Sequence, residues 1–451
     1  MPELYELSAA ELARQLRERT ITPVEVAQSL LDRIDALEPQ LDAWVRVDRE
    51  TVLADAQQRQ DELESGEATG PLQGVPIGIK DIFNIAGIPT TAGSKVYADY
   101  VPDETAVTIN LLQKAGAIML GKTVTTEFAC LDPSHTKNPW NPAHTPGGSS
   151  SGSAVSVAAR MCPIAMGSQT VGSVLRPASY NGIVGLKPTY GRVSRRGVVP
   201  VSWSLDTVGW MGRTVEDMAL LLQVMAGPDE EDPVASRLPA DDYLSGLESG
   251  KPPRIGLITA LFMEESDAET QKKTRDTLAK FTAAGATVVE LTLPESFNTA
   301  FEDQLLIMAS EAAAFHKPMY EKQAQDYRPK LREMLRQGLE TDAVTYSRAL
   351  ERRVRFSADM RVLADQVDVL LTPSTPTAPL ADLTNTGDTR FQGPWTSCGL
   401  PTITLPAGLA ESGLPMGIQL IASPFDEAQL FATARWCEKL IDVNLFPPVG
   451  N

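Results

Sequence analysis

Serine and glycine are concentrated in two short segments that could support nucleophilic catalysis. The first covers residues 145 to 153 and reads TPGGSSSGS, and the second covers residues 167 to 177 and reads GSQTVGSVLRP. Glycine allows a backbone of positive φ and a close approach to a ligand, so such loops can present consecutive N–H groups to an anion. An oxyanion hole requires that arrangement. These segments are therefore the first candidates for a site of acyl transfer.

Other interpretations of the two segments fit the sequence less well. Segments rich in Gly and Ser are often flexible linkers, but these lie between apolar helix and strand patterns. Neither G-x-x-x-x-G-K-[ST] nor G-x-G-x-x-G occurs here, which argues against a phosphate cradle. The G-x-S-x-G elbow of lipases is also missing around these serines.

The choice of a general base is narrow, because the chain has only three histidines, His135, His144 and His316. For each of them an ordinary surface or core role is the simpler interpretation. A lysine base is chemically possible, since burial disfavours the ammonium form and leaves a neutral amine. Lys80 stands where such a base is expected, at the end of the apolar run Val75 to Ile79.

Several further motifs extend these observations, and together they resemble the amidase signature family. The motifs lie at residues 74–81 (GVPIGIKD), 147–153, 172–177, 185–194 (GLKPTYGRVS), 204–209 (SLDTVG), 394–395, 399–401 and 413–420 (GLPMGIQL). The resemblance covers most of the chain and is weakest from 295 to 365. It implies a single large α/β domain over residues 1–451, in which helices cover both faces of a central mixed, twisted β-sheet.

The resemblance also implies a site. By position, the family's lysine falls on Lys80, its bridging serine on Ser149 and its acyl-forming serine on Ser173, and the 24-residue separation of the two serines agrees with the family pattern. The resemblance implies a cis Gly148–Ser149 peptide bond. It also implies a mechanism that needs no metal or cofactor. The oxyanion would be bound by the backbone N–H groups of Thr170, Val171, Gly172 and Ser173.

Three departures from the family pattern lie next to these residues. The usual Asp-Thr-Gly-Gly-Ser has Gln169 and Val171 in this chain, and the usual Arg two residues after the nucleophile is shifted to Arg176. Ser151 stands where Gly is common. These departures leave the Ser-Ser-Lys triad intact, but the geometry of the oxyanion loop cannot be read from the sequence.

The elements expected to position the site follow from periodicity and capping signals. Ser8 to Glu11 resembles a capping box, and Thr22 with Pro23 starts a second helix. We expect an N-terminal helical scaffold over residues 1–70, a signature core over 72–225 and a helical substrate-cap region over 295–365. Strands are predicted at 75–79, 117–120, 254–258, 287–293, 367–371, 402–405 and 416–421, and helices at 105–114, 154–159 and 267–284.

Composition excludes several classes of function. The chain has 451 residues, of which 43% are hydrophobic, so it can bury a large core. A formal charge of −18 argues against a nucleic-acid surface. The N-terminus lacks the pattern of a secretory signal, and no apolar run approaches the roughly 20 residues that span a bilayer. We expect a cytoplasmic protein with reduced thiols at Cys130, Cys162, Cys398 and Cys437.

The leading hypothesis is an amidohydrolase that cleaves amides, or related carbamates and ureas, of a small-molecule substrate, as a monomer or homodimer without direct nucleic-acid or membrane contact. The alternative is the glutaminase (A) subunit of a tRNA-dependent amidotransferase, a near relative by resemblance. A non-catalytic scaffold of the same fold is a third hypothesis, against which the joint presence of the triad residues speaks. Substrate contacts are weakly suggested for Cys130, Leu131, Phe391, Gln392 and Trp395, where ordinary packing explains each residue equally well.

Overall fold

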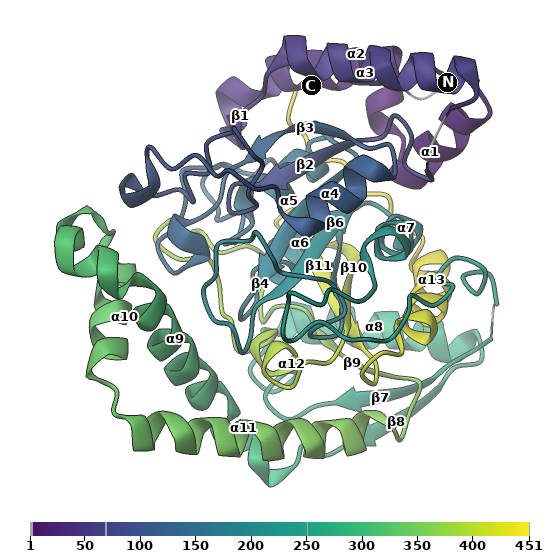
Figure 1. Cartoon of the computed structure of the whole chain (residues 1–451). Helices are drawn as coiled ribbons and strands as arrows, with labels where there is room; N and C mark the ends of the chain where they lie inside the picture. Colours follow the sequence, from purple (N-terminus) through teal and green to yellow (C-terminus); the bar gives the residue numbers. More distant parts are fainter. Residues whose placement is uncertain (1–2, 68–69, 250, 451) are drawn as a thin grey trace.

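The centre of the molecule is a mixed β-sheet. The computed structural model describes residues 3–67, 70–249 and 251–450, and in these ranges one 11-stranded sheet has the order β1-β3-β2-β4-β6-β5-β10-β11-β9-β7-β8 (Figure 1). The predicted single α/β domain with a mixed sheet is thereby confirmed. The strands are β1 (Trp44–Arg46), β2 (Pro76–Lys80), β3 (Ile118–Thr123), β4 (Ile164–Gln169), β5 (Val184–Lys187), β6 (Thr207–Gly212), β7 (Arg254–Ile258), β8 (Thr287–Leu291), β9 (Val369–Pro373), β10 (Thr402–Leu409) and β11 (Pro415–Ile421).

Parallel and antiparallel pairs occupy different parts of the sheet. β2 is parallel to both β3 and β4, and β7 is parallel to both β8 and β9. The strands between these two groups, from β4 to β9, are joined by antiparallel pairs. The carboxyl ends of β2 and β4 therefore meet at one edge, where Lys80 ends β2 and the second candidate segment leaves β4.

Helices cover the sheet in two groups, one on each face. The α-helices are α1 (Ala9–Arg17), α2 (Pro23–Leu41), α3 (Arg49–Ser65), α4 (Val107–Lys114), α5 (Ser151–Ala158), α6 (Leu175–Asn181), α7 (Val215–Met225), α8 (Ala268–Ala283), α9 (Ala300–Gln323), α10 (Pro329–Glu340), α11 (Ala343–Ala364), α12 (Gly393–Ser397) and α13 (Glu427–Ile441). α5 and α6 contact each other and the sheet. α13 contacts α7 and α8, and it also contacts β10 and β11, two of the strands that α6 contacts. Because both faces are covered, every residue of β4, β5 and β6 is buried.

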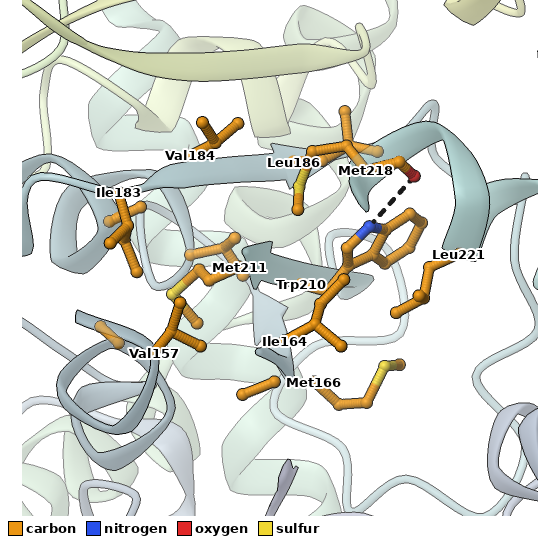
Figure 2. Packing of buried hydrophobic residues seen from close by; sticks show 14 of the residues in the cluster. Val157, Ile164, Met166, Ile183, Val184, Leu186, Trp210, Met211, Met218 and Leu221 are labelled. Carbon is orange, nitrogen blue, oxygen red and sulfur yellow. Dashed lines mark hydrogen bonds between the residues drawn. The ribbon is translucent and has the colours of Figure 1, made fainter. Parts of the chain in front are cut away.

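The core between α7 and the central strands is shown in Figure 2. Trp210 of β6 is fully buried, and its indole Nε1 donates a hydrogen bond of 3.2 Å to the carbonyl oxygen of Met218 in α7. Ile164, Leu186 and Leu221 surround it with apolar side chains. The bond satisfies the one polar atom of this large side chain, so the ring can lie deep in the core.

The N-terminal helices pack along one side of the sheet (Figure 1). Thr22 forms a full capping box with Glu25 at the start of α2, and Pro23 is the first residue of that helix. Ser8 accepts a hydrogen bond from the Glu11 backbone at the start of α1. Helices are thus found in the segment expected to be a helical scaffold over residues 1–70, apart from residues 1, 2, 68 and 69, which lie outside the described ranges.

Three long helices form a limb at the opposite side of the molecule, the green segment of Figure 1. They are α9, α10 and α11, and they occupy most of the block predicted to be helical over residues 295–365. α9 contacts α10, α11 and α12. No helix in the described ranges is long and apolar enough to cross a membrane. The four cysteines are buried free thiols.

Candidate active site

Lys80 ends β2 and is completely buried. Its Nζ atom donates hydrogen bonds to the hydroxyl oxygens of Ser149, at 2.8 Å, and Ser168, at 3.0 Å. Burial lowers the pKa of Lys80 to about 7, against the opposing influence of Asp206 and Cys130. Near neutral pH a large fraction of this side chain is therefore an uncharged amine that can accept a proton.

Ser149 lies in the loop before α5, directly after a cis Gly148–Ser149 peptide bond. Two contacts hold this loop. The guanidinium Nη2 of Arg176 donates to the Gly148 carbonyl at 2.7 Å, and the Thr126 N–H donates to the Ser149 carbonyl at 3.1 Å. The bridging serine expected from the sequence is thus brought into direct contact with Lys80.

Ser173 lies in the loop that joins β4 to α6, and its side chain is partly exposed. The Ser150 N–H donates to the Ser173 carbonyl at 3.3 Å, which connects the two serine-bearing segments. Because β2 and β4 are parallel neighbours, Lys80 and the segment that follows β4 are brought to the same edge of the sheet. The structure therefore gathers Lys80, Ser149 and Ser173 in one region.

The loop before Ser173 has its carbonyl groups bonded and its N–H groups free. The Thr170 carbonyl accepts from Gln304 Nε2 at 3.0 Å, and the Val171 carbonyl accepts from Thr396 Oγ1 at 2.9 Å. The Gly172 carbonyl accepts from the backbone N–H of Arg176 at 3.1 Å.

A trans peptide group is planar, so its N–H points away from its carbonyl. Each bonded carbonyl therefore directs the N–H group of the next residue away from the carbonyl's own partner, and these N–H groups belong to Val171, Gly172 and Ser173. Within the described ranges these three N–H groups have no hydrogen-bond acceptor. Unpaired N–H groups on consecutive residues are what an oxyanion hole requires.

Gln169, one of the departures from the family pattern, has a defined role in this loop. Its Oε1 accepts from the N–H groups of Val174, at 2.9 Å, and Leu175, at 3.0 Å. Its Nε2 donates to Thr396 Oγ1 at 3.0 Å. An amide can accept and donate at once, so Gln169 ties the start of α6 to α12. Within the described chain its side chain makes no hydrogen bond to that of Arg176, which instead binds Gly148 and Thr386.

A cavity of about 780 Å³ adjoins the Ser149 loop. Thr386, one of its lining residues, accepts a hydrogen bond from Arg176 and lies against Gly148, with its methyl carbon 3.0 Å from the position a Cβ would take there. Most lining residues come from α9, α10 and the loop around Thr386, and Leu131 and Thr341 add to them. They are Leu131, Leu305, Leu306, Met308, Ala309, Pro329, Lys330, Glu333, Met334, Gln337, Thr341, Asn385, Thr386, Gly387 and Thr389.

Of the five residues proposed for substrate contact, the structure places Leu131 in the wall of this cavity. Cys130 is buried nearby, and burial raises the pKa of its thiol. Phe391, Gln392 and Trp395 are fully buried and do not line the cavity. The Trp395 ring stacks on Phe262 with 5.3 Å between ring centroids, and both Phe391 and Trp395 belong to a hydrophobic cluster behind the site.

Two of the three histidines have partners elsewhere. His316 of α9 is buried against Tyr327, whose hydroxyl is 3.0 Å from Nδ1, and burial lowers the pKa of His316 to about 4. His135 lies on the surface beside Asp42. The side chains of these two histidines make no hydrogen bond to Ser149 or Ser173 in the described chain.

Sequence reasoning missed four residues that contact the site: Ser168, Asp206, Gln304 and Thr396. Ser168 is adjacent to the glycine that opens the second segment, and Asp206 lies in the motif at 204–209; these positions are the only signals the sequence offers. Gln304 and Thr396 lie more than a hundred residues from the loop they contact. Their contacts depend on tertiary packing alone.

Comparisons with known proteins find relatives over nearly the whole chain. The A subunit of the glutamyl-tRNA(Gln) amidotransferase of Carboxydothermus hydrogenoformans is 38% identical over 97% of this chain and 98% of that protein, and its counterpart in Myxococcus xanthus is 36% identical over 97% and 98%. The native peptide amidase of Stenotrophomonas maltophilia superimposes with a TM-score of 0.88 and 29% identity over the full length of both chains.

A second solved structure is described as an unexpected vestigial protein complex that reveals the evolutionary origins of an s-triazine catabolic enzyme. Its chain has a TM-score of 0.89 and 28% identity, over 96% of this chain and 98% of that one. The family model for amidases matches residues 25–431. The match over nearly the whole length, together with these relatives, shows that the chain belongs to the amidase signature family.

Proposed function

We propose that this protein hydrolyses an amide-type C–N bond through an acyl-enzyme on Ser173, with Ser149 and Lys80 as the proton relay. The observation that carries the proposal is the 2.8 Å hydrogen bond between Lys80 Nζ and Ser149 Oγ, made by a buried lysine whose pKa is lowered to about 7. A base of that pKa is matched to work near neutral pH.

The relay begins with neutral Lys80. The neutral amine keeps its hydrogen bond to Ser168 and turns its lone pair to Ser149, so that Ser149 becomes the donor across the 2.8 Å contact. Ser149 gives its proton to Lys80 and takes the proton of Ser173 as the Ser173 oxygen attacks the substrate carbonyl. The tetrahedral oxyanion is bound by the free N–H groups of Val171, Gly172 and Ser173, each worth roughly 3–4 kcal/mol in the transition state.

The same relay runs in reverse to complete the reaction. Protonated Lys80 returns its proton through Ser149 to the leaving nitrogen, so the amine departs neutral and the acyl group stays on Ser173. Water, deprotonated along the same path, then attacks the acyl-enzyme and releases the carboxylic or carbamic acid.

The cavity supports a substrate with an uncharged, largely apolar acyl part. Leu131, Leu305 and Met334 contribute apolar surface. Of the charged groups in the wall, Glu333 is paired with Arg336, and Lys330 donates to the Thr384 carbonyl. Aliphatic or aryl amides, and the related carbamates and ureas, present the required carbonyl without a charge that needs a partner.

A second candidate is favoured by a separate observation. Relatives with up to 38% identity over nearly the whole chain are the A subunits of a glutamyl-tRNA(Gln) amidotransferase. In that role the same triad would hydrolyse glutamine and act within a complex of several subunits. The two candidates differ in whether the chain is active alone.

A release assay separates the candidates. The purified chain is incubated alone with anilides, carbamates, ureas, simple primary amides and glutamine, with Ser173→Ala as the control. Turnover of an uncharged amide by the isolated chain, absent in Ser173→Ala, supports the first candidate. Activity on glutamine that appears only with two co-purified subunits supports the second. Turnover that is unchanged in Ser173→Ala refutes the mechanism.

A further inference from the structure

Thr170, the residue that opens the oxyanion loop, is held at two atoms. Its carbonyl accepts a 3.0 Å hydrogen bond from Nε2 of Gln304 in α9. Its hydroxyl donates a 2.6 Å hydrogen bond to Oδ1 of Asp206. Both partners lie far from the loop in the sequence, so the conformation of Thr170 depends on how the helical limb and the 201–206 loop pack against the core.

The loop that carries Asp206 is itself bonded to α9. Glu311 of α9 accepts from the backbone N–H of Ser204 at 2.9 Å and from the hydroxyls of Ser202 and Ser204. Asp206 closes the same loop by accepting from the N–H groups of Val201 and Ser202. One helix therefore reaches Thr170 directly through Gln304 and indirectly through Glu311.

Gln304 and Glu311 are seven residues apart, so they lie on the same face of α9, two turns from each other. Both side chains are buried, with exposed fractions of 0% and 1%. The neighbouring residues Leu305 and Met308 line the cavity beside the site. α9 thus contacts the oxyanion loop with one face while it forms part of the cavity wall.

The details of Gln304 favour a role in orientation over a role in stability. Its Oε1 is buried and has no partner in the described chain. A buried acceptor without a partner costs free energy, which an apolar side chain of similar size would avoid. The gain from Gln304 is instead the fixed direction of the Thr170 carbonyl, and hence of the Val171 N–H in the same peptide plane.

We propose that Gln304 is a positioning residue that orients the Thr170–Val171 peptide of the oxyanion loop, and that α9 is by this contact a part of the catalytic apparatus. The inference rests on the proposed function, because it requires Ser173 to form a tetrahedral adduct. It assigns the limb of Figure 1 a role beyond covering the substrate.

The test compares Gln304→Met with Gln271→Met. Methionine has a similar volume and cannot donate a hydrogen bond. Gln271 of α8 makes the same type of bond, from Nε2 to the Ser266 carbonyl at 3.0 Å, away from the site. The readout is the second-order rate constant for labelling of Ser173 by a fluorophosphonate, which builds negative charge on an oxygen in the oxyanion hole and needs no knowledge of the substrate.

We expect Gln304→Met to label about 10- to 100-fold more slowly, with an unchanged thermal midpoint, and Gln271→Met to label at the wild-type rate. With an amide from the release assay, kcat falls by a similar factor while KM changes less than about threefold, because the free N–H groups act on the transition state. Gln304→Glu, which sets an acceptor against the Thr170 carbonyl, is expected to be slower still.

Two outcomes overturn the inference. One is wild-type labelling by Gln304→Met. The other is a loss of rate accompanied by an equal loss in Gln271→Met or by a lower thermal midpoint, which would indicate general destabilisation. The failure of the proposed function is distinguishable, because in that case Ser173→Ala also labels or retains turnover, whatever Gln304→Met does.

Discussion

Two buried lysines stand side by side on neighbouring strands and have opposite surroundings. Lys80 on β2 and Lys122 on β3 are 0% and 3% exposed, and Lys122 pairs in register with the residue before Lys80. Lys122 forms an ion pair with Asp81 at 2.8 Å and also donates to the Phe83 carbonyl and the Thr90 hydroxyl. The Lys80 amine, within the described chain, donates only to the hydroxyls of Ser149 and Ser168.

This difference shows how the surroundings of a buried lysine determine its protonation state. Burial lowers the pKa of both lysines, but at Lys122 the carboxylate of Asp81 opposes the shift directly. A buried lysine with a counter-ion stays charged and serves the structure, whereas one with only hydroxyl partners loses its proton near neutral pH. The position of one carboxylate thus separates a structural lysine from a candidate catalytic one.

The largest effect is expected from Lys80→Met. The substitution removes the acceptor of the relay while keeping an unbranched side chain of similar size. We expect kcat/KM to fall by at least about 10³-fold with no loss of stability, since no buried carboxylate is left unpaired. Turnover and thermal unfolding of the same preparation measure both quantities, and residual activity within tenfold of wild type would exclude Lys80 as the base.

Lys122→Met is expected to lower stability and to leave kcat nearly unchanged. It leaves Asp81 buried without its counter-ion, which costs about 3–5 kcal/mol of unfolding free energy. The folded fraction should keep kcat within about threefold. Urea titration measures the loss, and the double variant Lys122→Met/Asp81→Asn should recover more than half of it. No recovery would show that the ion pair is not the cause.

The pH dependence of activity sharpens the comparison. The base must be neutral, so kcat/KM should rise with pH and reach half of its plateau near pH 7, the pKa of Lys80. Ser168→Asp gives Lys80 a carboxylate partner of the kind Lys122 has. We expect this variant to move the midpoint upward by at least about one unit, with at least about fivefold less activity at pH 7.

The pH profiles of wild type and Ser168→Asp are measured over pH 5.5–10 with one amide substrate, a range that extends roughly 1.5 units or more either side of the expected midpoint. Ser168→Asn is the control, because it has the same shape without the charge, and its midpoint should stay near that of wild type. A midpoint that is the same in Ser168→Asp and Ser168→Asn would contradict the assignment of Lys80 as the titrating group.

The smallest effects are expected from the hydroxyls on each amine. Ser168→Ala removes the acceptor that orients Lys80, so kcat should fall by about three- to tenfold with little change in stability. Thr90→Val removes an acceptor from Lys122 and should cost about 1 kcal/mol of unfolding free energy at unchanged kcat. The turnover and unfolding assays measure both variants. A loss of stability in Ser168→Ala together with a loss of kcat in Thr90→Val would contradict the distinction between the two lysines.

Motifs that are local in the sequence predicted the positions of the candidate triad and of several elements around it. β2 was expected at 75–79 and is found at Pro76–Lys80, and the helices of the limb fall in the block expected to be helical. β4, β5 and β6 were not predicted. Their residues are all buried and rich in glycine and small side chains, so they lack the alternation that reveals a strand with one exposed face.

The support of the oxyanion loop could not be predicted for a different reason. Gln304 and Thr396 are unremarkable in their own segments, and only the packing of α9 and α12 brings them to Thr170 and Val171. The same limit applies to the expected substrate contacts, since Phe391 and Trp395 adjoin family motifs and are buried in a hydrophobic cluster. Motifs identify reacting groups, while their orientation depends on long-range contacts.

The burial of Lys80 has a consequence for heat inactivation. Its neutral state exists only while β2 remains enclosed between β3 and β4, because an exposed lysine regains a pKa near about 10.4 and is protonated at neutral pH. Local opening of this sheet edge would protonate the amine before the chain unfolds as a whole. In the proposed mechanism, hydrolysis therefore stops in a partly opened molecule although Ser173 is still present.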